Sequence, residues 1–257
     1  MNGLQRRSYS FCSFCDNFEI KIGGSTEDFL KIYPRLSKIG QVIKIYRNFI
    51  LITDIAPITQ DHLLLISKNH FPSFASIPKG QRLGFKQSIE EIIQGMKEFH
   101  PNSEIFVFEH GVGKIGEKII RCGTCGRTEH AHLHILPIPN RSSTNTGIKL
   151  AKEISRSLGL KLRIIPPLPK LNLEFVVKKY PYLYLWSSNG EQGYVLVQTS
   201  SRVFVPSQVI RKFLLIKFFN PKEMRYKQDW RNYIFSHKGE GEQMILKTLN
   251  RWFSKKV

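Results

Sequence analysis

The sequence predicts an α+β protein: a domain with a mainly antiparallel sheet and helices, followed by a smaller, basic α+β C-terminal domain. Short β-branched segments follow one another closely, one long segment carries an apolar stripe at helical spacing, and a proline-rich connector precedes the last part of the chain. Because 257 residues with 41% hydrophobic content suffice for real cores, we expect a first domain over residues 10–146 and a second over residues 166–257.

The first strands are expected to form an antiparallel meander. Their residues alternate or run apolar with β-branched content, and short polar turns separate them. The three segments are Gln41–Tyr46, Phe49–Asp54 and His62–Ser67. A helix is predicted next over Gly80–Phe99, because its apolar residues fall on one stripe and His100-Pro101 would stop it.

A further strand, Glu104–Glu109, is followed by a glycine-rich, basic loop over His110–Glu129 and then by residues His130–Pro137. This last segment reads His-Ala-His-Leu-His-Ile-Leu-Pro. A strand has a side-chain period of two, so its three histidines would project from one face while its apolar residues enter a core. Pro137 and Pro139 are expected to end the strand.

Three imidazoles on one strand face are rarely a packing solution, because each carries a donor and an acceptor that need partners when buried. The alternatives are a chance polar face, a metal site formed by all three, and nucleophilic or acid–base chemistry. Adjacent positions on one strand face suit tetrahedral metal closure only moderately, so the chemical interpretation is favoured. The residues concerned are His130, His132 and His134.

The C-terminal part is expected to begin after a stiff connector at Pro166–Pro169. Tyr182–Trp186 and Tyr194–Gln198 flank a turn with Asn189-Gly190, which is the pattern of a β-hairpin. The predicted helices of the second half are Gly147–Leu158, Pro206–Phe219 and Glu240–Phe253.

The formal net charge is +19, and it is unevenly placed. Residues 147–257 hold 21 Lys and Arg against 7 Asp and Glu, whereas residues 1–146 hold 18 against 13. Such an excess attracts polyanions, either nucleotides or a nucleic acid backbone, although it can also simply solvate a surface. No apolar run approaches the roughly 20 residues that span a bilayer, and the start has no secretion signal, so we expect a cytoplasmic protein without a membrane partner.

The four cysteines form two pairs, each with two residues between its members. The pairs are Cys12 with Cys15 and Cys122 with Cys125. Two thiolates at this spacing on a tight turn suit two corners of a zinc tetrahedron. Disulfides are disfavoured in a reducing cytosol, and free structural cysteines are the alternative.

Four motifs in order along the chain carry a resemblance to a known family. They are Cys12-Ser13-Phe14-Cys15, Asp54-Ile55-Ala56-Pro57, His62 through His70, and His130 through Leu136. With these motifs, residues 10 to 140 resemble the histidine triad (HIT) superfamily of nucleotide hydrolases and transferases. A looser similarity is to its larger subgroup with a CwfJ-like C-terminal domain, and it is carried by Phe108-Glu109-His110-Gly111 and by Pro206 through Arg211 to Trp230-Arg231.

The resemblance implies that His132 attacks the α-phosphorus of a nucleoside phosphate ester or anhydride. The product would be a covalent nucleotidyl-histidine intermediate, which water or another acceptor then resolves. His134 would protonate or stabilise the leaving group, and His62 would orient His132. Asp54 would accept hydrogen bonds from the ribose hydroxyls. The implied substrate is a nucleotide such as a dinucleoside polyphosphate.

The resemblance also implies a structural zinc ion. In zinc-bearing relatives the ligands correspond to Cys12, Cys15, His70 and His130. The second cysteine pair offers a rival set, in which Cys122 and Cys125 replace the histidines. A homodimer is a further expectation, because small relatives dimerise, although a fused C-terminal domain would compete for the same surface.

Two positions depart from the family pattern. Asp61 stands where family members often have Gly, and Gly126-Arg127-Thr128-Glu129 stands in place of a Gly-Gln-Ser type phosphate loop. Arg127 and Thr128 are the candidate phosphate contacts in this loop.

Three functions therefore compete. The first is a nucleotidyl hydrolase or transferase that acts through His132. The second is an enzyme on adenylylated or capped 5′ ends of nucleic acid, with a single strand held by the basic domain through Arg211 and the pair Trp230 and Arg231; core packing is the alternative role for Trp230. The third is a non-catalytic module that binds zinc and nucleotide, and it predicts no turnover.

Overall fold

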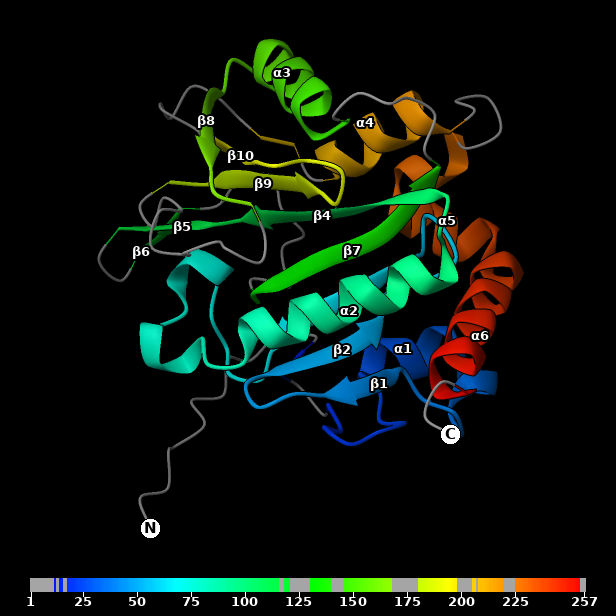
Figure 1. Cartoon of the computed structure of the whole chain (residues 1–257). Helices are drawn as coiled ribbons and strands as arrows, with labels where there is room; N and C mark the ends of the chain where they lie inside the picture. The colour runs from blue at the N-terminus through cyan, green and yellow to red at the C-terminus, as the bar shows by residue number, and fades with distance from the viewer. Residues whose placement is uncertain are drawn as a thin grey trace.

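Apolar segments from both halves of the chain join one eight-stranded sheet in which all neighbouring strands are antiparallel. The computed structural model describes residues 12, 14–15, 18–115, 118–120, 130–139, 146–167, 180–197, 205–206, 208–219 and 225–254. The strand order is β1-β2-β3-β7-β4-β9-β10-β8 (Figure 1). The strands are β1 (Val42–Ile45), β2 (Phe49–Thr53), β3 (Leu63–Ser67), β4 (Ser103–Gly111), β7 (His132–Pro139), β8 (Lys161–Ile165), β9 (Tyr182–Ser187) and β10 (Gly193–Val197).

The predicted meander is confirmed as β1, β2 and β3. The histidine strand β7 pairs with β3, the last strand of the meander, and lies between β3 and β4. Its register pairs His134 with Leu64 on one side and with Phe108 on the other. Backbone hydrogen bonds on both sides therefore hold the histidines near the middle of the sheet.

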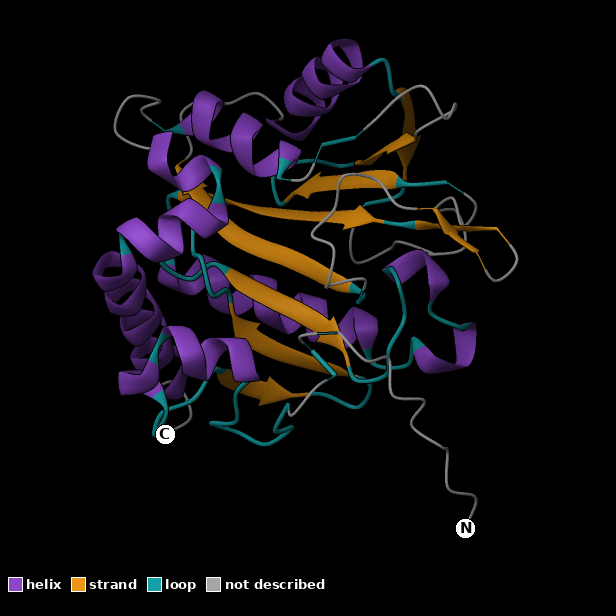
Figure 2. Ribbon diagram, turned by 180° about the vertical axis from the view of Figure 1, so that it is seen from behind, coloured by secondary structure: helices purple, strands orange, loops and turns teal. Residues whose placement is uncertain are grey.

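Helices cover the two faces of this sheet, as Figures 1 and 2 show from opposite sides. The helices are α1 (Glu27–Ile32), α2 (Phe85–Phe99), α3 (Thr146–Leu158), α4 (Val209–Phe218), α5 (Trp230–Ser236) and α6 (Lys238–Ser254). The core under α2 includes Ile89, Ile92, Ile105, Val107, Leu133 and Ile135. The core under α3 and α4 includes Phe106, Phe108, Leu136, Ile138, Leu150 and Leu214. Strand residues alternate between the two faces, so each face has its own core. An antiparallel sheet covered by helices confirms the α+β class that the sequence predicts.

Two predicted boundaries are wrong. The helix predicted from Gly80 begins at Phe85, because the backbone at Gly84 has a φ of +86°, which interrupts regular helix and is readily adopted by glycine. The histidine strand begins at His132 rather than at His130, and it ends at Pro139, one of the two prolines that were expected to end it. At these prolines β7 has only β4 as a neighbour, since the pairing with β3 stops at Ile135, and a strand with one open side tolerates proline.

The sequence patterns did not predict α1, α5, β8 or a small hairpin. Edge strand β8 has largely exposed residues, and α1 and α5 are short. The predicted loop after residue 110 contains a small hairpin of β5 (Gly113–Ile115) and β6 (Lys118–Ile120). Short 3-10 helices at Pro34–Leu36, Phe74–Ser76, Lys79–Gln81 and Arg225–Gln228 complete the described elements.

The sheet runs across the expected division between residues 10–146 and 166–257. Strand β9 pairs with β4 along its whole length, and α6 packs against β1 and β2 at the other end of the sheet. The division into two folding units stays a prediction. Within the described part of the chain, none of the helices combines the length and apolarity needed to cross a membrane.

Candidate active site and metal centre

Strand β7 presents its histidines and its apolar residues to opposite faces, as the alternation predicts. Ala131, Leu133 and Ile135 are buried in the core under α2. His132 and His134 are half-buried on the other face, where they line a pocket. The remaining lining residues are His62, Pro72, Phe108, His110, Val112, His130, Gln208, Val209, Ile210 and Arg211.

His132 is held as a neutral imidazole, and no hydrogen bond from the described residues engages its second nitrogen. Its Nδ1 lies 2.6 Å from the backbone oxygen of His130 and, opposite a carbonyl, must donate the hydrogen bond. The lone pair of the neutral ring is therefore on Nε2. Burial, together with the neighbouring His134, lowers the pKa of His132 to about 4. This side chain is consequently suited to act as a nucleophile at neutral pH.

The tautomer of His134 follows from that of His62. The backbone N–H of Ile58 donates to His62 Nδ1 at 3.2 Å, so the proton of neutral His62 is on Nε2. His62 Nε2 lies 3.1 Å from His134 Nδ1 and donates to it. The proton of neutral His134 is then on Nε2. Burial lowers the pKa of His62 to about 3, although the Asp54 carboxylate opposes this shift.

Asp54 lies beneath these two histidines. Its Oδ1 accepts from the backbone N–H of Ala56 at 2.6 Å, and its Oδ2 is 3.6 Å from His62 Nε2 and 3.4 Å from His134 Nδ1. Burial alone would raise the pKa of Asp54, but the two histidines outweigh it and hold this pKa below its ordinary value. The contact of Asp54 with a ribose stays a prediction, because only 6% of the residue is exposed and its described partners are protein groups.

Strand β4 contributes two aromatic rings to the pocket, and the sequence pattern had predicted no role for either ring. The ring of Phe108 stacks on His134, with centroids 4.4 Å apart and planes 8° from parallel. Burial lowers the pKa of His110 to about 3, which keeps this imidazole of the pocket neutral as well. Alternation along β4 was the available signal, because Phe108 and His110 share the face of Phe106.

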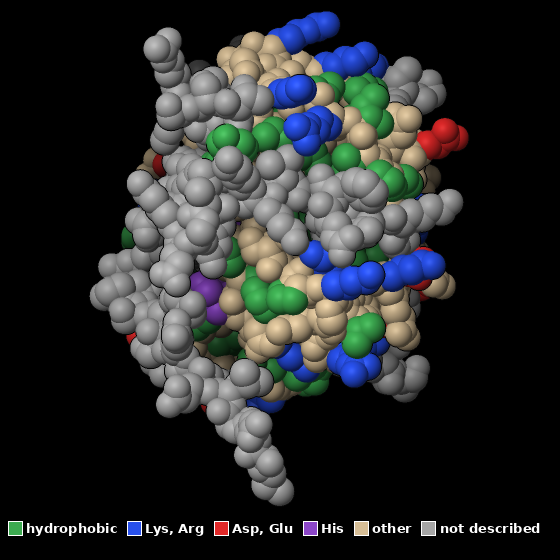
Figure 3. All heavy atoms as spheres, turned by 90° about the vertical axis from the view of Figure 1, so that its left-hand side faces the viewer, with side chains coloured by type: hydrophobic (Ala, Val, Ile, Leu, Met, Phe, Trp, Pro, Cys, Tyr) green, Lys and Arg blue, Asp and Glu red, His purple; other side chains and the backbone are tan. Residues whose placement is uncertain are grey.

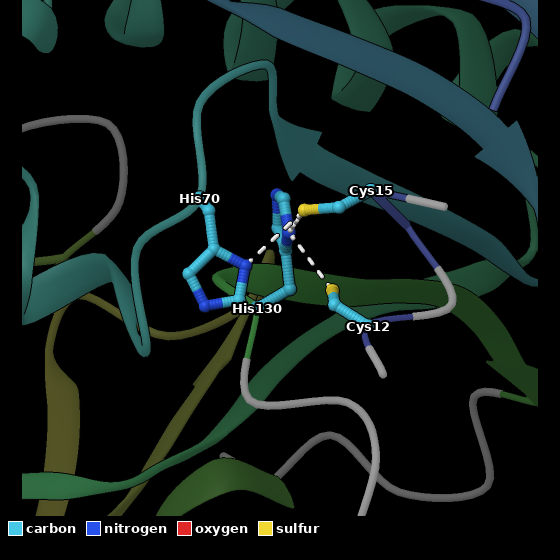
Figure 4. A group of neighbouring side chains, drawn as sticks. All are labelled: Cys12, Cys15, His70 and His130. Atoms are coloured by element: carbon cyan, nitrogen blue, oxygen red, sulfur yellow. Dashed lines mark hydrogen bonds between the residues drawn. The ribbon is translucent and has the colours of Figure 1, made fainter. Parts of the chain in front are cut away.

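A second group of side chains brings together the four predicted metal ligands, as Figure 4 shows. Cys12 and Cys15 come from a tight N-terminal turn, in which the Cys15 N–H donates to the Cys12 carbonyl. His70 follows β3, and His130 directly precedes β7. Sγ of Cys15 lies 3.2 Å from His70 Nδ1 and 3.5 Å from His130 Nδ1, and Sγ of Cys12 lies 3.5 Å from His130 Nδ1.

These distances fit a single tetrahedral ion. Zinc bonds of about 2.0 to 2.3 Å place neighbouring ligand atoms roughly 3.3 to 3.8 Å apart. His130 Nε2 donates to the backbone oxygen of Ser67 at 2.7 Å, so the lone pair of neutral His130 is on Nδ1, toward the thiols. Hydrogen bonds from Cys15, His130 and His70 outweigh burial and hold the pKa of the Cys12 thiol below its ordinary value. The cluster is therefore able to bind a metal ion.

Not every predicted residue can be placed. Arg127, Thr128, Cys122 and Cys125 lie outside the described residues, so the phosphate loop and the rival zinc set stay predictions. Arg211 is only 4% exposed and lies in the histidine pocket rather than on an open surface.

Among the described residues on the face drawn in Figure 3, Lys and Arg side chains are dispersed among other types. On α5 the Arg231 guanidinium lies 5.2 Å from the centre of the Trp230 ring. A single-stranded nucleic acid partner and a homodimer stay predictions.

Solved structures similar to this chain include histidine triad proteins. A Hit-like protein from Bartonella henselae is 18% identical over 46% of this chain and 84% of its own, with a TM-score of 0.30. Yeast Ap4A phosphorylase Apa2, solved with AMP, is 11% identical over 71% and 70%, with a TM-score of 0.40. A histidine triad protein from Clostridium difficile is 19% identical over 45% and 97%, with a TM-score of 0.26.

A comparison with family models finds no match to the sequence, and a comparison with curated proteins finds none either.

Proposed function

We propose that this protein is a nucleotidyl hydrolase or transferase of the histidine triad type, with His132 as its nucleophile. The observation that carries the proposal is the 2.6 Å hydrogen bond from His132 Nδ1 to the backbone oxygen of His130. It fixes the ring orientation and leaves Nε2 free in a pocket that also holds His134 and Arg211. A neutral imidazole with a fixed orientation is the requirement for attack on phosphorus.

In the proposed first step, His132 Nε2 forms a bond to the α-phosphorus of a nucleoside phosphate, and the bond from that phosphorus to the leaving oxygen breaks. The N–H of His134 Nε2, whose position follows from the hydrogen bond between His62 and His134, donates a hydrogen bond to the leaving oxygen, which departs as an anion with the electron pair of the broken bond. In the second step, water forms a bond to the phosphorus of the nucleotidyl-histidine, and the bond from that phosphorus to His132 Nε2 breaks, so that its electron pair returns to the ring. The attacking water loses one proton to the solvent, and the nucleotide is released. A different acceptor in place of water makes the reaction a transfer.

We further propose that the cluster of Cys12, Cys15, His70 and His130 binds a structural zinc ion. Two thiolates and two imidazoles complete a tetrahedral set and leave no position for a substrate. The ion would tether the N-terminal turn to the start of β7. It would supply no step of the reaction but would stabilise the backbone that carries His132.

The test replaces the nucleophile. His132→Ala should leave nucleotide binding within about threefold of the parent but lower turnover of dinucleoside polyphosphates by several orders of magnitude. Incubation of the parent chain with a substrate labelled at the α-phosphorus, followed by alkaline denaturation, should leave the label on the peptide that contains His132, because phosphorus–nitrogen bonds are labile in acid.

His237→Ala is the matched control, since His237 lies between α5 and α6 and is not among the residues that line the pocket. It should retain the turnover of the parent. Turnover by the His132→Ala protein near that of the parent, after contaminating activity has been excluded, would contradict the nucleophile assignment.

A further inference from the structure

The pocket has a wall that comes from the far C-terminal part of the chain. Helix α4 places its first turn, Val209 to Arg211, and the preceding Gln208 among the residues that line the pocket with the histidines. These residues follow β7 by about 70 positions in sequence, yet they share a cavity with His132 and His134. These residues take no part in the two reaction steps proposed above.

The first turn of α4 presents unsatisfied backbone donors. The first N–H groups of a helix have no acceptor within the helix, and they carry the positive end of its dipole. In α4, a helix of ten residues, the side chain of the N-cap residue Gln208 makes no capping hydrogen bond. Such a turn is suited to bind an oxyanion.

Arg211 provides an independent observation at the same place. Its guanidinium is almost completely buried, and its Nε donates to the backbone oxygen of Lys227 at 2.5 Å. Its Nη2 is buried without a hydrogen-bond partner. No described carboxylate lies within ion-pair distance of it, although Asp54 and Asp229 are near enough to act on its pKa. Burial lowers this pKa, and the nearby Asp54 and Asp229 carboxylates oppose the shift.

The neighbouring cation, Lys227, provides no counterion for the Arg211 guanidinium. Lys227 is also buried, but it forms an ion pair with Glu240 and donates to the backbone oxygen of Ile58. Lys227 thus has an ion pair, whereas Arg211 has none among the described residues. An unpaired buried charge is expensive, and a bound anion removes the penalty.

We propose that Arg211 Nη2 and the first-turn amides of α4 form a subsite for a phosphate group of the leaving portion of the substrate. This inference rests on the proposed function and names the substrate class: nucleoside polyphosphates, in which at least one further phosphate follows the one that His132 attacks. Arginine binds such a group through charge-assisted hydrogen bonds. The N–H of His134 would then donate a hydrogen bond to an oxygen of a leaving group that the subsite already holds in place.

The binding test uses inorganic tripolyphosphate with the full chain and needs no turnover. Tripolyphosphate should raise the melting temperature of the parent and bind with a measurable Kd in calorimetry. Arg211→Gln, which removes the charge, should weaken this binding by tenfold or more, consistent with loss of roughly 1.5 to 3 kcal/mol from a charged hydrogen bond. Lys212→Gln is the matched control, because it makes the same charge change at an exposed position on the same helix, outside the pocket.

Turnover provides the second readout. Arg211→Gln should lower kcat/KM at least tenfold for a dinucleoside polyphosphate but less than threefold for a nucleoside phosphoramidate, whose leaving group carries no phosphate. Equal losses on both substrates would overturn the subsite and indicate a general structural role. So would an unchanged affinity for tripolyphosphate in Arg211→Gln, or the absence of any thermal shift in the parent.

The two proposals can fail separately. His132→Ala should lose turnover and still bind tripolyphosphate as the parent does. If it keeps its turnover while Arg211→Gln loses tripolyphosphate binding, the nucleophile assignment is wrong and the subsite stands. If Arg211→Gln does not fold, Arg211→Lys keeps the charge but shortens the donor set, and it should show the same selective loss. Retained tripolyphosphate binding in that variant would also overturn the subsite.

Discussion

The three histidines on β7 and just before it differ in chemistry because their hydrogen-bond partners differ. His130 gives its Nε2 proton to Ser67 and turns Nδ1 toward the thiols. His132 does the reverse, with Nδ1 bonded to a carbonyl and Nε2 free. His134 receives a hydrogen bond from His62. A sequence pattern can predict that the three share a face, but it cannot predict these partners, since Ser67 and His62 lie more than 60 residues away in sequence.

At the metal cluster, His70→Ala should reduce bound zinc from about one ion per chain to near zero and lower the melting temperature. The reason is that a structural ion contributes directly to folding. Metal analysis and thermal unfolding measure the two effects. Turnover should fall as well, because His130 supplies both a ligand atom and the carbonyl that orients His132.

Cys122→Ser is the companion variant for the metal prediction, and it should keep the ion. Loss of zinc from the Cys122→Ser protein together with its retention in the His70→Ala protein would assign the metal to the rival cysteine set.

At the scale of single elements, β4 buries the carboxyl group of Glu109 on one face of the strand. Glu109 points to the face opposite Phe108, where its Oε1 accepts from the Phe74 N–H at 2.8 Å and its Oε2 accepts from the hydroxyl of Tyr182 on β9. Only 3% of the residue is exposed. Burial raises the pKa of Glu109 to about 7, and its two hydrogen bonds oppose this shift.

This raised pKa predicts a stability that depends on pH. The contribution of Glu109 is fully present below its unfolded pKa of 4.5 and is lost as the pH rises through about 7. The loss is on the order of 3 kcal/mol in the free energy of unfolding. Urea unfolding from pH 5 to pH 8 measures it, and Glu109→Gln should flatten the decline because the amide stays neutral.

The buried neutral histidines act in the opposite sense at low pH, so the quantity to compare is the difference between parent and variant at each pH. A decline of equal slope in the Glu109→Gln protein would exclude Glu109 as its source.

Periodicity predicted the long elements well and the short ones poorly. The meander, α2, α3 and α6 have strong apolar patterns, because each buries one complete face. In contrast, most residues of β8 are exposed, and α5 has only two buried residues. The predicted metal ligands meet as expected, whereas the place of Arg211 in the pocket depends on how α4 packs over β7 and β4. That packing is a tertiary property that no local pattern encodes.

At the scale of the whole molecule, one residue connects the C-terminal helix α6 to the first half of the chain. Asp61, the position that departs from the family pattern, has a φ of +63°, in the region that glycine adopts most easily. Its Oδ2 accepts from His100 Nε2 and from Arg251 Nη1, each at 2.6 Å, and its Oδ1 accepts from the Trp252 indole at 3.2 Å. The carboxylate therefore fastens α6 to the first half of the chain.

Asp61→Asn tests this connection. Asparagine tolerates the same backbone conformation, but it leaves Arg251 without its buried counterion, so the free energy of unfolding should fall by about 3 kcal/mol. Urea unfolding followed by tryptophan fluorescence measures the change, since Trp252 lies on α6. The parent should unfold in one transition, because strands from both halves share a sheet.

Asp229→Asn is the matched control for Asp61→Asn, since Asp229 caps α5 and asparagine caps a helix equally well. Two separate transitions in the parent, or an unchanged free energy in the Asp61→Asn protein, would contradict the proposed connection.

The strand order also limits how a second copy of this chain can attach. Both sides of β4 are occupied, by β7 and by β9, so the sheet can grow only at β1 or at β8. On β8, exposed Lys161 and Arg163 flank the backbone edge, and a second β8 laid against it would bring like charges together. Charged edge residues of this kind oppose the addition of further strands. A homodimer built by continuing the sheet is thus disfavoured at β8, so that a two-fold assembly would have to use the other edge strand, β1, or helices and loops.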